Sequence, residues 1–177
     1  MIPLDEVQKI YNDVSEWLKF AEAKHAGLFA IWIALLIGVV STDLFSTLNM
    51  TLQVIIIIVI LLGSSINLFS FVPFLNRFVW LKNHCFKKYS SIGENVVFYQ
   101  SIFVKTYKDN MNDSIEEYKK ILTRKGFGTI DGDLINDYIR QVIEVSTVGT
   151  IKVYLFSLAV KYTVIVMIIT AVGLIIA

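Results

Sequence analysis

The stretch EWLKFAEAKHAGLFAIWIALLIGVV (residues 16–40) begins as a charged, amphipathic helix and ends as a run of residues that water would not solvate. Glu22, Lys24 and His25 stand where this character changes. No proline or glycine interrupts residues 4–25, so we expect the polar arm to continue into the apolar run as one helix. Such a helix would pass from water into a membrane.

Three runs of the 177-residue chain are apolar enough to cross a bilayer. Residues 26–42 and 52–72 contain no charged residue, and residues 153–177 contain one, Lys161. The apolar fraction of 55% and the mean hydropathy of +0.64 exceed the values of ordinary soluble proteins. A single short run could be a buried core helix, but three in one chain predict an integral membrane protein.

The positively charged residues predict how the chain is oriented. None lies in the link STDLFSTLNM (residues 41–50), three lie in the N-terminal arm, and 12 lie in residues 76–152. Because cytoplasmic segments carry the excess of Lys and Arg, we expect the N-terminus and the long middle segment in the cytoplasm and the C-terminus outside.

Helical periodicity marks the polar segments. Apolar residues of the arm recur every 3.5 positions, at Val7, Ile10, Val14, Trp17 and Ala21. Helical faces also mark residues 95–124, with a break expected near residues 109–113 and an end at Gly126 and Gly128. We predict an all-α membrane protein with three transmembrane helices and a cytoplasmic helical bundle. Its segments are the arm (1–25), a transmembrane hairpin (26–72), the cytoplasmic helical region (73–152) and the third transmembrane helix (153–177).

Signatures of catalysis are missing from the sequence. It contains no glycine-rich phosphate loop, GxSxG, HExxH or CxxC. His84 beside Cys85 makes a poor metal site, because two adjacent ligands cannot complete a coordination sphere. The net charge of +1 does not suit a binder of nucleic acid polymers. We therefore predict a protein that is not an enzyme and has neither a cofactor nor a metal.

Lys161 makes the third apolar run unusual. It follows Lys152 by nine residues, about 13 Å along a helix. If Lys161 is the anchor at the membrane surface, 16 residues or about 24 Å remain to cross a core of about 30 Å. If Lys152 is the anchor, Lys161 lies inside the membrane and needs a partner. We expect a homo-oligomer in which Lys161 faces protein or water, with simple snorkelling as the alternative.

Aromatic and basic residues alternate in LNRFVWLKNHCFKKYSS (residues 75–91), directly after the second apolar run. This composition is typical of segments at a membrane interface. Membrane lipids are therefore expected partners.

Four stretches, in order along the chain, resemble the bacterial Pycsar effector family, small transmembrane proteins of anti-phage defence. FAEAKHAGLFA (20–30) is similar to the Ala-Glu-x-Lys-(His/Ala) segment that opens the family's first span, and FSFVPFLN (69–76) resembles the proline-bearing exit of the second. NVVFYQSIFVKTYKDNMNDSIEEYKK (95–120) and DYIRQVIEVSTVGTIKVYLFSLAVKY (137–162) resemble the middle helix and the entry to the last span. Gly149 and Val153 depart from the family pattern.

The resemblance implies a function. A cognate cyclase makes a signal after infection, often cyclic CMP or cyclic UMP, and the effector senses it and disrupts the bacterial inner membrane, so that growth stops. A cyclic oligonucleotide is the alternative ligand. The residues that match the family pattern are Glu22, Lys24, Asn95, Tyr99, Gln141, Ser146 and Lys152.

A phosphodiester ring needs cations, hydrogen-bond donors and an aromatic surface. The expected ligand-binding residues are Lys24, Asn95, Tyr99, Arg140, Gln141 and Lys152, and the expected helix-locking or gating residues are Glu22, Ser146 and Lys161. If Lys152 and Arg140 prove dispensable, we expect the site in residues 76–93. The alternative functions are a ligand-independent membrane scaffold and a holin-like pore former; three spans leave little room for a transporter.

Overall fold

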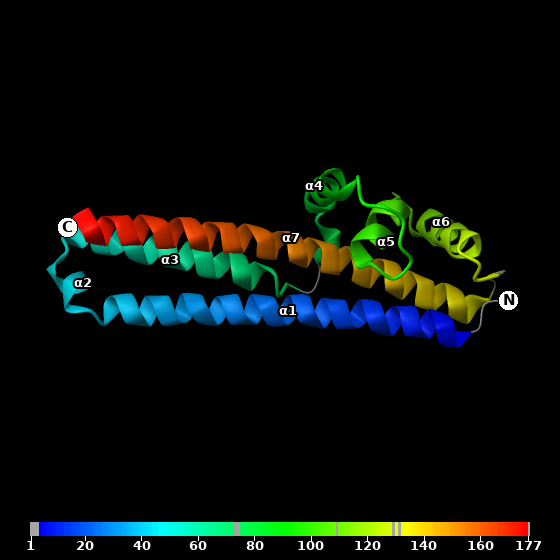
Figure 1. The fold of residues 1–177 in the computed structure, drawn as a ribbon, viewed down its shortest axis with the longest axis horizontal. Coiled ribbons are helices and arrows are strands. Elements are labelled where there is room, and N and C mark those ends of the chain that lie inside the picture. Colours follow the sequence, from blue (N-terminus) through cyan, green and yellow to red (C-terminus); the bar gives the residue numbers. More distant parts are fainter. Residues whose placement is uncertain (1–3, 73–74, 109, 129, 131, 177) are drawn as a thin grey trace. The chain divides into compact units, whose positions relative to one another are not determined.

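Every regular element that the structure describes is a helix, which confirms the predicted all-α class. The structure is a computed structural model that describes residues 4–72, 75–108, 110–128, 130 and 132–176, without the side chains of residues 44 and 170–176. The elements, labelled in Figure 1, are α1 (Leu4–Val40), α2 (Asp43–Thr47), α3 (Met50–Phe69), the 3-10 turn η1 (Leu75–Arg77), α4 (Val79–Tyr89), α5 (Tyr99–Thr106), α6 (Met111–Arg124) and α7 (Asp133–Ile176).

The chain folds into two compact units. The first unit comprises Met1–Ala21 and Phe74–Val153, and the second comprises Glu22–Pro73 and Tyr154–Ala177. Two helices contribute to both units, because α1 runs unbroken for 37 residues and α7 for 44. The prediction that the polar arm and the first apolar run form one helix is therefore confirmed, and Gly149 does not interrupt α7. The proline of the family-like exit, Pro73, lies outside the described residues.

An aliphatic core with a central tyrosine holds the first unit together. It is built from one face of α1 and from α5, α6 and the beginning of α7, and its buried members include Val7, Val14, Ile102, Leu122 and Ile139. Tyr118 is 1% exposed and donates a hydrogen bond of 2.6 Å to the carbonyl oxygen of Val96. Trp17, which the periodicity placed in the seam, is 45% exposed and packs against Tyr99 at 6.1 Å between ring centroids.

Local signals fix the ends of the short helices. The break expected near residues 109–113 is present, since α5 ends at Thr106 and α6 begins at Met111. The side chain of Asn110 caps α6 by accepting from the N–H of Asn112 at 3.0 Å. Gly126 ends α6 with φ of +90°, and the N–H groups of Gly126 and Phe127 donate to the carbonyls of Thr123 and Leu122.

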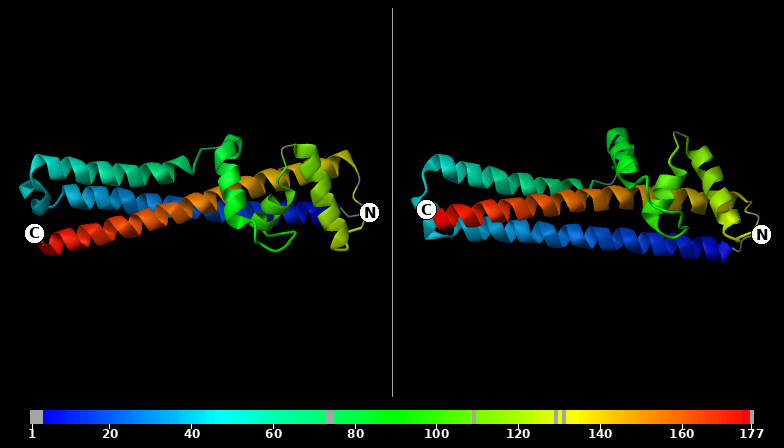
Figure 2. Two further views of the ribbon diagram at one scale, coloured as in Figure 1. Left: turned by 90° about the horizontal axis from the view of Figure 1, so that it is seen from above. Right: turned by 45° about the horizontal axis from the view of Figure 1, so that its top comes forward.

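The second unit packs α3 against parts of α1 and α7, which run alongside it in Figure 2. Trp32 is fully buried at its centre, beside Ile60 and Ala159. Its indole lies against Gly63, where an added Cβ would come within 2.6 Å of the ring. The Tyr162 ring packs at 5.7 Å from Trp32, and its hydroxyl donates to the carbonyl oxygen of Val59 at 3.0 Å.

Three helices are long and apolar enough to cross a membrane: α1, α3 and α7. The surface of the second unit is correspondingly apolar. On α3 the exposed large apolar side chains are Met50, Leu52, Val54, Ile55, Ile58, Leu61, Leu62 and Leu68. Lipid tails are the solvent that such a surface suits, so the structure supports the predicted membrane protein.

Candidate functional site

The predicted site residues are divided between the two units. Lys24, Glu22 and Lys161 belong to the second unit, while Asn95, Tyr99, Arg140, Gln141, Ser146 and Lys152 belong to the first. The Lys24 ammonium lies over the Phe156 ring at 5.7 Å from its centroid, Glu22 is half-buried, and Lys161 is exposed. His25, the third ionisable residue of the opening stretch, is fully buried, and its ring packs against Phe156 at 5.4 Å.

Asn95 holds the start of α5. Its side-chain oxygen accepts from the N–H groups of Val97 and Phe98 at 2.9 and 3.0 Å. Its own N–H donates to the Ser101 hydroxyl at 2.7 Å, and that hydroxyl donates to the carbonyl oxygen of Gly93. These bonds give a structural reason for an asparagine at this position without any ligand.

Tyr99 is a packing residue in this structure. It is 7% exposed, and its ring lies near Trp17 and Phe98. A Cβ added to Gly149 would touch the Tyr99 ring at 3.5 Å, so the glycine lets the ring lie close to α7. Burial raises the pKa of the Tyr99 hydroxyl. With 7% of its surface exposed, Tyr99 leaves little of its ring for a nucleobase to stack on in this structure.

The predicted residues of α7 differ in exposure. Arg140 and Gln141 are exposed, whereas Lys152 is 4% exposed and Ser146 is fully buried. The Ser146 hydroxyl has no hydrogen-bond partner in the described part of the chain. None of the six predicted ligand-binding residues lines either of the two hollows described below.

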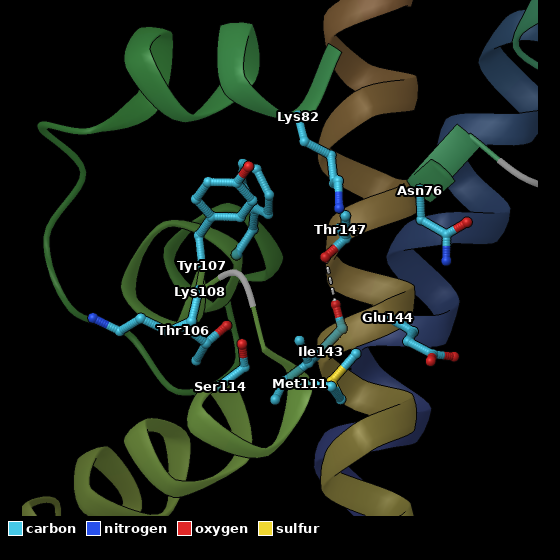
Figure 3. Close-up of a pocket in the computed structure, with 11 residues that line it drawn as sticks. Asn76, Lys82, Thr106, Tyr107, Lys108, Met111, Ser114, Ile143, Glu144 and Thr147 are labelled. Carbon is cyan, nitrogen blue, oxygen red and sulfur yellow. Dashed lines mark hydrogen bonds between the residues drawn. The ribbon is translucent and has the colours of Figure 1, made fainter. Parts of the chain in front are cut away.

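The first unit contains a cavity of about 150 Å³, and two of its lining residues, Asn76 and Lys82, lie in residues 76–93, the alternative site expected from the sequence. Its walls come from η1, α4, α5 and the loop after it, the start of α6, and α7 (Figure 3). The lining residues are Asn76, Lys82, Phe103, Thr106, Tyr107, Lys108, Met111, Ser114, Ile143, Glu144 and Thr147.

An aromatic cluster supports one side of this cavity. The Tyr107 ring lies 5.1 Å from Phe86 and 5.4 Å from Phe103 between centroids, and its hydroxyl donates to the Asn83 side chain. The Lys82 ammonium lies 5.9 Å from the Tyr107 centroid. The fixed ring therefore holds the lysine stem in place.

Hydroxyl groups line the cavity as acceptors. Those of Thr106, Ser114 and Thr147 each donate to a carbonyl oxygen one turn earlier in the chain, at 2.7, 3.1 and 2.8 Å. The donors toward a bound molecule are then the Lys82 ammonium and the Asn76 amide. In Figure 3 the Lys82 side chain reaches toward Thr147, the Lys108 side chain points away, and Glu144 lies farther along α7.

This arrangement suits a ligand with an anionic group at one end and a hydrogen-bond donor at the other. Lys82 and Asn76 would bind the anion, and the Glu144 carboxylate would accept from the donor. The volume is below the roughly 300 Å³ of typical small-molecule pockets. The cavity would therefore bind part of a small molecule and leave the rest of that molecule outside.

Two other features are weaker candidates. A hollow beside α6 is lined by charges that pair with one another or with Glu94, such as Lys119 with Glu116 at 2.9 Å. Cys85 is fully buried, and burial raises the pKa of its thiol to about 11, with nearby Lys88 opposing the shift. Among the described residues, no three His, Cys, Asp or Glu side chains are grouped to hold a metal.

Comparison with protein families gives a match over nearly the whole chain. The model of the Pycsar effector protein domain matches residues 6–177, nearly the whole chain. Neither a curated protein nor a solved structure matches. Since the match covers the arm, the cavity-bearing first unit and all three candidate spans, the chain belongs to the Pycsar effector family.

Proposed function

We propose that this chain senses a cyclic nucleotide in the cavity of the first unit and then disrupts the bacterial inner membrane. Its family supports the broader assignment to an anti-phage transmembrane effector rather than to a known class of enzyme. The observation that carries the finer proposal is the position of the cavity. Its wall includes Ile143, Glu144 and Thr147 of α7, the helix that continues without a break into a candidate span.

The cavity chemistry favours a cyclic mononucleotide with a donor on its base. Lys82 and Asn76 would donate to the cyclic phosphate. Glu144 would accept from the exocyclic amine of cytosine, whereas uracil presents a carbonyl oxygen there, which a carboxylate repels. We therefore expect cyclic CMP to bind more tightly than cyclic UMP. The cavity of about 150 Å³ would hold part of a cyclic mononucleotide and a smaller part of a cyclic oligonucleotide.

The response would pass along α7. A ligand between α4 and α7 would press on residues 143–147, where Ser146 buries its hydroxyl without a hydrogen bond in the described chain. A buried, unpaired hydroxyl makes the resting packing less favourable and easier to rearrange. Because α7 is continuous to Ile176, a rotation or shift of this stretch would carry into the span.

Topology and assembly complete the proposal. With 12 of its Lys and Arg residues in positions 76–152, the first unit would lie in the cytoplasm, where a cyclase releases its product. Lys161 is exposed and lies within the third apolar run, where lipid alone would be a poor partner for its charge. We expect it to face a second copy of the chain or a water-filled path in a homo-oligomer.

Binding to the purified full chain tests the ligand and the site together. Melting would be followed in detergent with cyclic CMP, cyclic UMP, cyclic AMP and cyclic dinucleotides. A ligand at 100 times its Kd adds about 2.7 kcal/mol of stability. Lys82→Ala should weaken cyclic CMP binding at least about tenfold, because it removes a charge-assisted bond. Lys125→Ala, an exposed lysine outside the cavity, should bind as the parent does.

Glu144→Gln should reduce the preference for cyclic CMP over cyclic UMP, because an amide can donate to the uracil carbonyl. Normal binding by Lys82→Ala, with loss of binding in Lys152→Ala and Arg140→Ala, would place the site at the residues expected from the sequence. If no nucleotide raises the melting temperature, the result would instead favour a ligand-independent scaffold or a holin-like pore former.

A further inference from the structure

We infer that the outward face of α4 is a docking surface for the headgroups of anionic lipids. The first observation is the distribution of charge. The 12 residues from Arg77 to Lys88 contain four basic side chains, one of which, Lys82, lines the cavity, and no acidic residue occurs anywhere between Asp43 and Glu94. In a chain whose net charge is +1, this is a strongly positive segment. Clusters of this size beside a transmembrane helix attract anionic lipid.

The second observation is the way α4 divides its side chains between two faces. Leu81 and Cys85 are fully buried, while Phe86 packs against Tyr107 of the first unit. The opposite face leaves Trp80 64% exposed, with Lys87 exposed two turns farther along.

Val79, 59% exposed, stands next to Trp80 on this outward face. Exposed tryptophan and valine beside lysine suit the boundary between acyl chains and phosphates, because the ring enters the apolar layer and the ammonium stays with the headgroups. A soluble polyanion would use the lysines but would gain little from the exposed valine. The combination therefore favours a lipid surface.

The third observation is the short segment of chain that connects α3 to α4. α3, a candidate span, ends at Phe69, and α4 begins at Val79. The nine residues between them reach about 30 Å even when fully extended. The chain therefore cannot carry the start of α4 more than about 30 Å from the end of this candidate span, which raises the local concentration of headgroups around it.

Hydrogen–deuterium exchange of the full chain in nanodiscs would test this surface. Discs of phosphatidylcholine alone would be compared with discs that also contain phosphatidylglycerol. We expect the amides of α4 to exchange several-fold more slowly with the anionic lipid, and salt at about 0.5 M to reduce the effect by screening. The amides of α6 serve as an internal reference and should not change.

Two double variants carry the same change in charge. Lys87→Glu with Lys88→Glu should abolish the lipid-dependent protection of α4, and Trp80→Ser should weaken it. Lys9→Glu with Lys125→Glu, both exposed and outside α4, should retain it. Equal exchange in both lipids, or equal loss in the two double variants, would overturn the inference. Protection in neutral discs by added tripolyphosphate, without any effect of phosphatidylglycerol, would also overturn it and indicate a site for soluble anions.

Discussion

The two units share the helices α1 and α7, but their hydrophobic cores are built from different kinds of residues. The interior of the first unit is a large aliphatic cluster from α1, α5, α6 and α7. That of the second unit is a small cluster around Trp32, with Leu28, Ile60 and Ala159. Both units also bury polar side chains; in the second unit, Ser64 and Asn67 of α3 and Ser70 directly after it bond to backbone carbonyls of that helix.

This difference shows how the surrounding solvent selects an interior. In water, burying Leu, Ile and Val drives packing, so the first unit places its large aliphatic residues inside. In lipid that driving force between helices is absent, and association depends on close packing and on hydrogen bonds. The second unit accordingly turns Leu and Ile outward and places Gly63 against Trp32.

The largest expected effect comes from filling the contact between Gly63 and Trp32. Gly63→Ala should destabilise the second unit by about 3 kcal/mol, because the new methyl group would overlap a buried ring that has no room to move. Gly38→Ala is the matched control, since a Cβ at Gly38 meets nothing within 4 Å and alanine favours a helix. Unfolding by heat in detergent should separate the two variants clearly. Equal stability would show that the second unit does not depend on close packing.

Cys85 tests whether the first unit excludes water. Burial raises its thiol pKa from 9.0 to about 11. The folded chain then holds this proton more tightly than the unfolded chain, so the stability gained below pH 9 is lost as the pH rises toward 11. The carbon-13 chemical shift of the labelled Cys85 Cβ should reach the midpoint of its titration near pH 11 in the folded protein and near pH 9 after denaturation. A midpoint near 9 in both states would show that water reaches the α4 side of this unit.

Two tyrosines make the same bond in different surroundings. Tyr118 in the first unit and Tyr162 in the second each donate to a backbone carbonyl. Tyr118→Phe should cost about 1 to 2 kcal/mol, because it leaves the Val96 carbonyl buried without its donor. Tyr162→Phe should cost about 0.6 kcal/mol, the typical value within membranes. Denaturant titrations in detergent would give both values, and the reverse order would contradict the comparison.

Local chemistry made much of the fold predictable. The absence of breakers before His25 predicted the continuous α1, the stretch near residue 110 predicted the gap between α5 and α6, and Gly126 predicted the end of α6. Apolar runs of sufficient length predicted the three candidate spans. In each case the deciding residues are close together in the sequence.

The candidate site was not predictable in the same way. The cavity brings Lys82 together with Tyr107 and Thr147, residues far apart in the sequence, and periodicity does not say which faces meet. Asn95 and Tyr99 match the family pattern and were expected to bind ligand, but the Asn95 side chain bonds within the turn before α5, and Tyr99 is buried. A matched residue can reflect folding as well as recognition.

The unbroken course of α7 has a consequence for how this protein can vary in length. In an α-helix, each residue is rotated by about 100° around the helix axis relative to the residue before it. One residue inserted near Gly149 would therefore rotate every later side chain of α7 to a different face, whereas the same insertion between α4 and α5 would only lengthen a loop. Homologous chains should thus differ in length in their loops and keep the spacing from Ile139 to Tyr162 constant.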